Sequence, residues 1–285
     1  MNKKVLKTLE YYKIIDMLSE FATSASGKEL CNNLEPSTDL VEIKLTQQQT
    51  ADALTRIYQK GSLSFSGTHN VGASLKRLEI GGTLNIEELL KIASLLEVAK
   101  RAKTYSRSDR GDTKADSLDE FFSRIEPLTP LLEEIRRCII SEDEIADDAS
   151  VNLRNIRRSM KNINEKIRNQ MNTMLNSTST RNLLQDAVIT MRNGRYCLPV
   201  KAESKGQVPG MIHDQSSTGS TLFIEPMSVV KLNNDLREFS LKEQEEIETI
   251  LANLSNLTAE YIPYLKDNFK ILTKLDFIFA KGSLA

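Results

Sequence analysis

The sequence is poor in the residues that build disulfide-bonded, metal-binding or membrane-spanning proteins. Its 285 residues include no tryptophan, 3 cysteines and 2 histidines. Cys31, Cys138 and Cys197 lie far apart and form no Cys-x-x-Cys pair, so neither a disulfide framework nor a thiolate metal site is expected, and a reducing cytosol fits best. No stretch approaches the roughly 18 apolar residues of a membrane span, and the first residues lack the apolar run of a signal peptide. We expect a soluble, cytoplasmic protein without a membrane partner.

Catalytic motifs are also missing. The chain has no Gly-x-x-x-x-Gly-Lys-Ser/Thr loop to cradle phosphates. His213, Asp214 and Ser216 have the ingredients of nucleophilic catalysis, but neighbouring residues on a strand point to opposite faces, so a satisfied polar hairpin is the better interpretation. His69 stands alone in a loop. We therefore expect no catalytic residue, no metal site and no cofactor in these 285 residues.

Most of the chain has helical periodicity, which predicts a mainly α fold. Apolar residues recur every three positions over residues 5–22, which favours one amphipathic helix. A second helical piece is expected from Ser24–Gly27 to about Leu34, and a long helix is expected to start at Ser37 or Thr38 and to run through Tyr58. Asn85 is expected to cap the clearest amphipathic helix, and Ser106–Asp116 to form a polar linker.

Two long helices are predicted to form an antiparallel pair. From Asn152 onward, apolar residues alternate three- and four-residue steps up to a break at Asn176–Thr180, as in coiled coils. A second stripe of this kind starts at Met227, and Pro263 ends or kinks that helix. The pair would hold the intervening segment at its far end, like a lever.

The segment between the two helices is the part of the chain that has β character. Val188–Arg192 alternates in polarity, Asn193-Gly194 supplies the positive φ angles of a tight turn, and the chain returns from Arg195. Two further short strands are expected near Gly210–His213 and Thr221–Glu225. These runs predict a small antiparallel module. Phe223-Ile-Glu225 resembles a base-probing wedge, but its strand context favours a core phenylalanine.

Positive charge is concentrated in this half of a chain whose net charge is −1. Between Val151 and Lys205 there are eleven basic and three acidic residues, whereas the returning helix carries a cluster of glutamates. The helix charges are expected to pair across the two helices. For the module, phosphate contact and an ordinary solvated surface are both open. The candidate nucleic-acid-binding residues are Arg192, Arg195, Lys201, Lys205 and His213.

Four stretches and a short motif resemble the second bacterial class of MutS proteins, the MutS-two family. Leu184–Pro226, LQDAVITMRNGRYCLPVKAESKGQVPGMIHDQSSTGSTLFIEP, is similar to the signature region of that family. The other similar stretches are Leu6–Pro36, Leu78–Leu90 and Leu275–Ala285, and the Asp-Asp-Ala-Ser at Asp147–Ser150 stands where the family starts its lever. The resemblance spans nearly the whole chain in order.

The resemblance implies a fold and a division of the chain. It implies a mainly α, MutS-like helical core with a long antiparallel helix-pair lever that carries a small antiparallel β module, the clamp. The expected parts are a helical core at 1–145, an outgoing lever helix at 146–182, the clamp at 183–226, a returning lever helix at 227–262, and a return to the core at 263–285 that leads to a missing ATPase domain.

The resemblance also implies a function for the longer protein. That protein would be an ATP- and Mg-dependent homodimer that ends in an Smr endonuclease domain, while this segment would hydrolyse no ATP and cut no nucleic acid. The clamp would hold branched DNA in recombination suppression, or ribosomal RNA of collided ribosomes in ribosome rescue. The alternative is a structural, dimerising coiled-coil module without nucleic-acid contact; a free-standing enzyme has almost no support.

Overall fold

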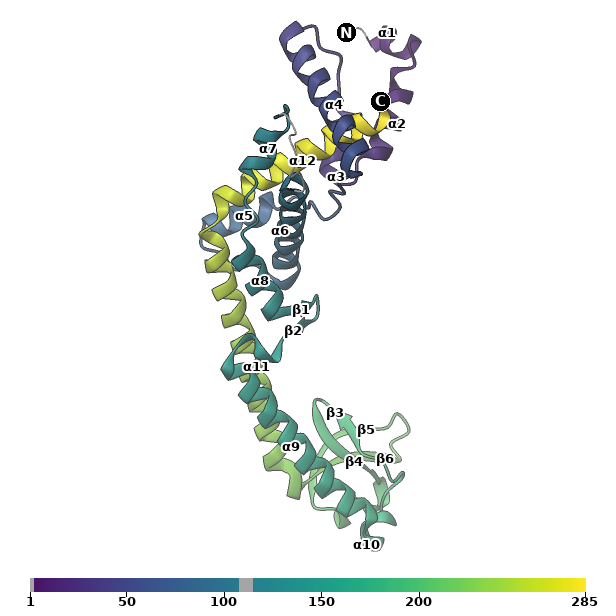
Figure 1. Cartoon of the computed structure of the whole chain (residues 1–285). Coiled ribbons are helices and arrows are strands. Elements are labelled where there is room, and N and C mark those ends of the chain that lie inside the picture. The colour runs from purple at the N-terminus through teal and green to yellow at the C-terminus, as the bar shows by residue number, and fades with distance from the viewer. Residues whose placement is uncertain (1–2, 108–114) are drawn as a thin grey trace. The chain divides into compact units, whose positions relative to one another are not determined.

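The computed structural model describes residues 3–107 and 115–285, and these fold mainly into helices with small antiparallel sheets (Figure 1). The expected mainly α fold with a small β module is confirmed. The chain divides into two compact units. Unit 1 is Met1–Ala146 with Leu251–Ala285, and unit 2 is Asp147–Ile250. The finer division into core, lever and clamp stays a prediction.

Unit 1 is helical apart from a short hairpin that the sequence did not predict. The hairpin strands are only three and two residues long, too short to show a period. The elements of unit 1 are α1 (Lys3–Thr8), α2 (Tyr11–Phe21), α3 (Ala25–Asn32), α4 (Leu40–Lys60), α5 (Gly72–Glu79), α6 (Ile86–Arg107), α7 (Asp119–Arg124), α8 (Thr129–Cys138), β1 (Ile139–Ser141), β2 (Glu144–Ile145) and α12 (Ile262–Leu284).

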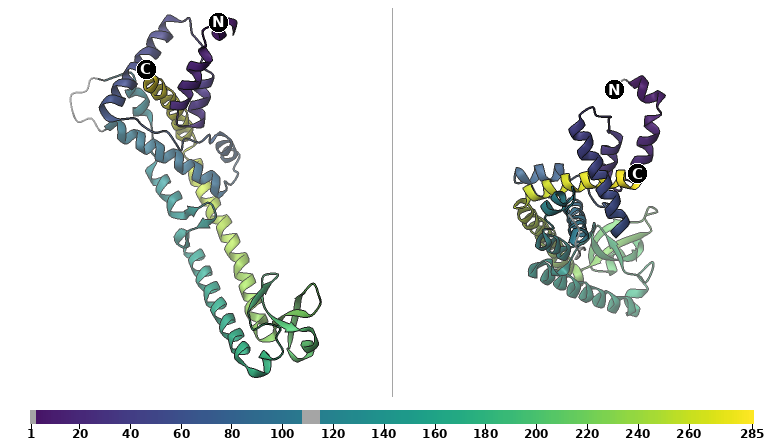
Figure 2. Two further views of the ribbon diagram at one scale, coloured as in Figure 1. Left: turned by 90° about the vertical axis from the view of Figure 1, so that its right-hand side faces the viewer. Right: turned by 45° about the horizontal axis from the view of Figure 1, so that its top comes forward.

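The helix α12 is the central element of unit 1. It packs against α2, α3, α4, α5, α6 and α7 (Figure 2). Its side chains Leu272, Leu275 and Ile278 are fully buried. A helix that is apolar on most of its circumference is stable in water only when neighbours cover it on several sides, which explains its position inside the unit.

A buried carboxylate on α12 fixes the start of α3. Asp276 is 1% exposed and accepts hydrogen bonds from the amide and hydroxyl of Thr23 and of Ser24. Ser24 also caps α3 by accepting from the Gly27 amide at 3.0 Å. A Cβ atom at Gly27 would lie 2.1 Å from a carboxylate oxygen of Asp276, so the close approach requires glycine at this position.

The expected single helix over residues 5–22 is wrong. The chain breaks at Glu10, whose φ of 53° is left-handed, and Leu9 is 64% exposed. The reason lies in the spacing: each three-residue step turns about 300° around a helix, so the apolar stripe winds around the axis and does not stay on one face. Ile15 and Leu18 are the buried residues of α2.

The N-terminal cap was predicted correctly for α6 and incorrectly for α4. The side chain of Asn85 accepts from the Glu88 amide at 2.8 Å, while Glu88 accepts from the Asn85 amide at 3.1 Å. This reciprocal arrangement is a capping box, and it confirms the predicted start of α6. For α4 the expected cap was wrong, because Asp39 accepts from the Val41 amide and takes the position expected for Ser37 or Thr38.

The three cysteines are free and buried. Burial and, secondly, a nearby carboxylate together raise the pKa of each thiol to about 11. Neutral, buried thiols of this kind are poor nucleophiles.

Unit 2 combines two long helices with a four-stranded antiparallel sheet of order β3-β4-β6-β5. The strands confirm the four predicted runs, and the break after α9 falls at the predicted place. The elements are η1 (Asp147–Ala149), α9 (Val151–Asn176), α10 (Thr178–Arg181), β3 (Thr190–Arg192), β4 (Arg195–Lys201), η2 (Ala202–Gln207), β5 (Gly210–Gln215), β6 (Thr221–Pro226) and α11 (Met227–Ala259), whose last turns belong to unit 1.

The core of unit 2 joins both long helices to one face of the sheet. Ile163, Ile167 and Met171 of α9 are buried in one cluster with Leu198 and Ile224 of the sheet. Apolar residues of α11 pack on the same cluster. The predicted stripe of α9 therefore faces the β-module as well as the second helix.

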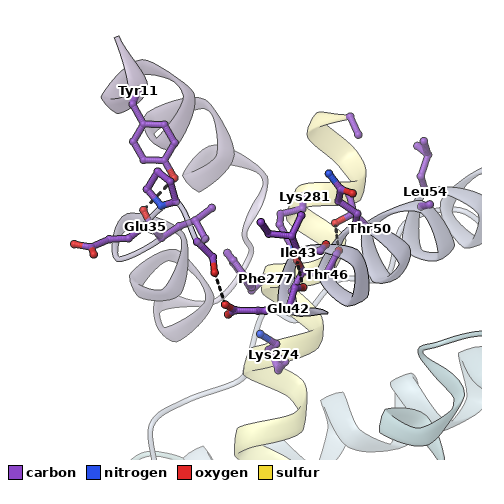
Figure 3. A pocket seen from close by; sticks show the side chains of 16 residues that line it. Tyr11, Glu35, Glu42, Ile43, Thr46, Thr50, Leu54, Lys274, Phe277 and Lys281 are labelled. Atoms are coloured by element: carbon purple, nitrogen blue, oxygen red, sulfur yellow. Dashed lines mark hydrogen bonds between the residues drawn. The ribbon is translucent and has the colours of Figure 1, made fainter. Parts of the chain in front are cut away.

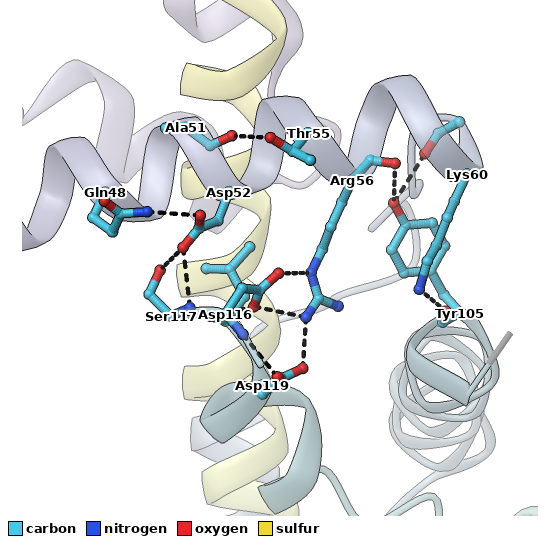
Figure 4. Close-up of polar contacts among 12 residues, drawn as sticks. Gln48, Ala51, Asp52, Thr55, Arg56, Lys60, Tyr105, Asp116, Ser117 and Asp119 are labelled. Atoms are coloured by element: carbon cyan, nitrogen blue, oxygen red, sulfur yellow. Dashed lines mark hydrogen bonds and ion pairs between the residues drawn. The ribbon is translucent and has the colours of Figure 1, made fainter. Parts of the chain in front are cut away.

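An ion cluster ties α4 to the start of α7 (Figure 4). The Arg56 side chain, 7% exposed, donates to Asp116 at 2.6 and 2.7 Å and to Asp119 at 2.7 Å. Asp52 accepts from the amide and hydroxyl of Ser117. These bonds fix Asp116, the last residue of the predicted linker Ser106–Asp116, and the residues that follow it. The first two linker residues belong to α6, and residues 108–114 lie outside the described part.

In the described residues, no helix combines the length and the apolar character needed to cross a membrane.

We predict that Asp116→Asn destabilises unit 1 by about 2 kcal/mol at pH 7, because it leaves the buried Arg56 without its main counterion. Burial raises the pKa of the Asp116 carboxyl, but the hydrogen bonds from Arg56 and the Leu118 amide outweigh burial and lower it below 3.8. A carboxyl whose pKa is lower in the folded than in the unfolded state stabilises the fold above about pH 4. This stabilisation decreases as the pH falls and the folded-state carboxyl becomes protonated. Urea unfolding at pH 7 and pH 3 measures the difference between wild type and variant.

The matched control is Asp119→Asn, whose side chain is 52% exposed and should cost less than about 1 kcal/mol. Equal effects of the two variants, or an Asp116 effect as large at pH 3 as at pH 7, would contradict this account.

Candidate nucleic-acid interface

The five candidate residues lie on the β-module and its connections. Arg192 ends β3, Arg195 starts β4, and the turn between them has φ angles of 52° at Asn193 and 73° at Gly194. Lys201 ends β4, so about 20 Å of strand separates it from Arg195. The structure therefore places the arginines at one end of β4 and the lysines at the other, and it does not gather the five cations in one cluster.

Two of the candidates contact a buried carboxylate. Glu225 of β6 is 0% exposed and accepts from Arg195 Nη1 at 2.9 Å. His213 Nε2 contacts the other carboxylate oxygen, and Asn233 Nδ2 of α11 donates to Glu225 at 2.7 Å. Arg195 also donates to Asn234 of α11 at 2.7 Å. This Glu225 cluster joins three strands to α11, and it directs the side chains of Arg195 and His213 toward a buried carboxylate.

Arg192 is partly engaged and partly accessible. Its guanidinium lies 3.9 Å from the centre of the Phe223 ring and forms an ion pair with Asp214 at 3.2 Å. Its side chain is 38% exposed. A planar guanidinium stacked on a ring keeps its edge free to donate hydrogen bonds. Arg192 covers the Phe223 ring and Glu225 is buried. In this structure the Phe-x-Glu sequence therefore packs within the β-module and is not exposed as a base-probing wedge.

The two lysines differ in their contacts. Lys201 Nζ donates to the Asn182 carbonyl at 3.1 Å. Lys205, in η2, is exposed and has no hydrogen bond or ion pair with any residue that the structure describes. Of the five candidates, Lys205 is thus the one whose charge is fully available to a ligand.

The structure does not assemble His213, Asp214 and Ser216 into a catalytic triad. Ser216 Oγ accepts from the Thr221 amide at 3.1 Å, while His213 contacts Glu225. The Gly219 amide donates to the Ser216 carbonyl at 2.8 Å, which closes an ordinary turn. Across residues 3–107 and 115–285, no group of three or more His, Cys, Asp or Glu side chains could hold a metal ion.

One face of α9 carries a basic surface that the candidate set missed. At 100° per residue, five basic side chains fall within an arc of about 100° and along about 21 Å of helix. We call this the α9 basic face: Arg154, Arg157, Arg158, Lys161 and Arg168.

Ion pairs neutralise only part of the α9 basic face. Arg157 contacts Glu243 of α11 at 2.7 Å, and it is the one cross-helix ion pair of α9 among the described residues. Arg154 pairs with Asp148. Arg158, Lys161 and Arg168 are exposed and form no ion pair within the described chain. The expectation that the helix charges pair across the two helices is correct for Arg157 and wrong for these three.

A groove of about 460 Å³ runs beside the α9 basic face. Arg157, Lys161, Arg168 and one acid, Glu165, line it from α9. Glu243, which pairs with Arg157, lines it from α11, and Tyr196 lines it from β4. The Tyr196 hydroxyl donates to Asn164 Oδ1 at 2.8 Å, which fixes the ring at the edge of the groove. Positive charge beside an aromatic ring suits a nucleic-acid strand, whose phosphates and bases need these two kinds of contact.

We predict that Glu225→Gln destabilises unit 2 by about 3 kcal/mol, because it leaves Arg195 without its buried counterion. Asp214→Asn removes the exposed partner of Arg192 and should cost less than about 1 kcal/mol. Hydrogen exchange of the β4 and β6 amides in both variants measures this. Protection in Glu225→Gln that equals wild type would show that the Glu225 cluster does not stabilise the sheet.

Comparisons with known proteins cover the whole chain. No protein-family model matches it. The chain is 60% identical over 285 residues to a protein named endonuclease MutS2 from Agathobacter rectalis, 54% identical to the one from Lachnoclostridium phytofermentans, and 52% identical to the one from Lachnospira eligens. In each case the match covers 100% of this chain and 36% of the relative. The chain therefore belongs to the MutS2 family, and it spans about a third of the length of the curated relatives it matches.

Proposed function

We propose that unit 2 holds a nucleic-acid backbone within a longer MutS2 protein, through the α9 basic face and the accessible cations of the β-module. The observation that carries this proposal is the set of three exposed, unpaired cations on one face of α9: Arg158, Lys161 and Arg168. Exposed cations at helical spacing can each neutralise a phosphate and release counterions, which supplies affinity without reading base sequence.

The family supports a nucleic-acid target. The relatives are named endonucleases, and an endonuclease acts on nucleic acid. Within this proposal the target is branched DNA, as in recombination suppression, or ribosomal RNA of collided ribosomes, as in ribosome rescue. Both expose a phosphate backbone, so both fit a surface that binds phosphates rather than a base sequence.

Activities of the longer protein belong to the same proposal. It would act as a cytoplasmic, ATP- and Mg-dependent homodimer with a nuclease domain, and the segment described here would contribute binding without catalysis. The helix α11 runs unbroken from Met227 to Ala259, so it connects unit 2 to unit 1 by a single hydrogen-bonded element. Such an element can pass a rotation at one end to the other, as a lever requires.

The test uses the 285-residue chain, a fluorescent four-way DNA junction and purified ribosomes, titrated at several salt concentrations. We predict that the triple variant Arg158→Glu, Lys161→Glu, Arg168→Glu binds at least tenfold more weakly than wild type. The slope of log affinity against log salt should fall by up to about 0.9 for each lost phosphate contact.

The matched control reverses three exposed lysines of unit 1, Lys28→Glu, Lys44→Glu and Lys270→Glu, and so makes the same change in net charge. It should keep most of the affinity and the salt slope. If the two triple variants lost the same affinity, the weaker binding would be due to the change in net charge and not to the α9 basic face. Binding that does not depend on salt, or no binding by wild type, would favour the alternative of a structural, dimerising module.

We further predict that Lys205→Glu weakens binding by about tenfold while the unfolding free energy stays within about 0.5 kcal/mol of wild type, since Lys205 is exposed and unpaired. Arg195→Glu is not a clean test, because it would place a second acid beside the buried Glu225. Unchanged binding in Lys205→Glu would exclude η2 from the interface and leave the α9 basic face as the site.

A further inference from the structure

Unit 1 contains a cavity that the nucleic-acid interface does not use. It has a volume of about 580 Å³ and lies between α4 and α12, with Tyr11 and Leu34 at its edge (Figure 3). Apolar atoms of Ile43, Leu54 and Phe277 supply much of its lining. This volume is within the range of pockets that bind small ligands, which is about 300–1,000 Å³.

Two lysines of α12 line this cavity beside the same aromatic ring. Lys274 and Lys281 stand three residues before and four residues after Phe277, a spacing that puts all three on one side of the helix. Their ammonium nitrogens lie 5.3 and 4.8 Å from the centre of the Phe277 ring. Both ammonium groups therefore lie next to the Phe277 ring and close to each other.

No acidic group pairs with these lysines. Neither of them has a hydrogen bond or ion pair with any residue that the structure describes. Glu35 and Glu42 line the cavity from the other side, and Glu42 accepts a hydrogen bond from the Ser37 hydroxyl at 2.6 Å. Cys31 of α3 adds no anion at neutral pH, because burial raises its pKa to about 11.

This environment disfavours the protonated amine of Lys281. Burial and, secondly, the charge of Lys274 lower the pKa of Lys281 from 10.5 to about 8. About a quarter of the amine is then neutral at pH 7.5, compared with about a thousandth for an ordinary lysine. Desolvation and a neighbouring cation are the two conditions that turn a lysine into a nucleophile toward carbonyl compounds.

We propose that Lys281 captures small anionic carbonyl compounds in this cavity as a reversible imine. The lone pair of Nζ attacks the carbonyl carbon, and the carbonyl oxygen leaves as water with the two protons that Nζ loses. A carbon–nitrogen double bond remains, and the imine nitrogen then takes one proton from solvent. The step needs no oxidant or reductant. A carboxylate or phosphate on the ligand offsets the positive charges of Lys274 and of the protonated imine, and the apolar lining accommodates the rest of the ligand.

The experiment uses 4-carboxybenzaldehyde as the probe and cyanoborohydride to trap the imine at pH 7.5. Mass spectrometry of peptides then gives the initial labelling rate of each lysine. The reference is Lys270, an exposed lysine of the same helix that does not line the cavity. Lys281 should be labelled on the order of tenfold faster than Lys270, since its larger neutral fraction outweighs its lower basicity. The neutral analogue 4-formylbenzamide should show a several-fold smaller preference.

Variants separate the nucleophile from its neighbour. Lys281→Arg should abolish the preferred label and leave the other lysines unchanged. Lys274→Met should slow the labelling of Lys281 several-fold, because the amine loses the repulsion that favours its neutral form. Lys270→Met should leave the rate at Lys281 unchanged, and thermal unfolding followed by circular dichroism checks that each variant folds. A Lys281 rate no higher than that of Lys270, or equal preference for the two aldehydes, would overturn the proposal.

Discussion

The buried carboxylate of Glu225 is the constraint on which unit 2 depends. A carboxylate without solvent contact is stable only with counterions and hydrogen-bond donors around it, and here β4, β5 and α11 supply them. The sheet is therefore fixed to α11 by charge as well as by apolar packing. The same requirement explains why cations that look available in the sequence are occupied in the fold.

Much of the fold follows from local sequence. The Asn85–Glu88 capping box and the Asn193-Gly194 turn each place their own bonding partners within three residues, so each could be recognised without tertiary information. The position of the break at Glu10 could not, since the three-residue spacing shows that the apolar stripe winds around the axis but not where the helix ends. The β1–β2 hairpin is too short to produce a pattern.

The candidate site was predictable as a region but not as a set of residues. The excess of positive charge between Val151 and Lys205 located the basic half of the chain. It could not show that Arg195 contacts Glu225, thirty residues away, or that Arg157 is the one basic residue of α9 in the described chain that forms an ion pair with α11. Helical spacing places the five residues of the α9 basic face on one side of the helix, but it does not show which of them pair with α11.

The three buried thiols have a consequence for how opening of the molecule can be observed. Cys31 lies in α3, Cys138 at the end of α8 and Cys197 in β4, so each reports on a different part of the chain. A thiol reagent reaches a buried, neutral cysteine only when the surrounding structure opens. The native chain thus carries three built-in reporters of local opening, two in unit 1 and one in unit 2, and the order in which they react ranks the stability of these parts.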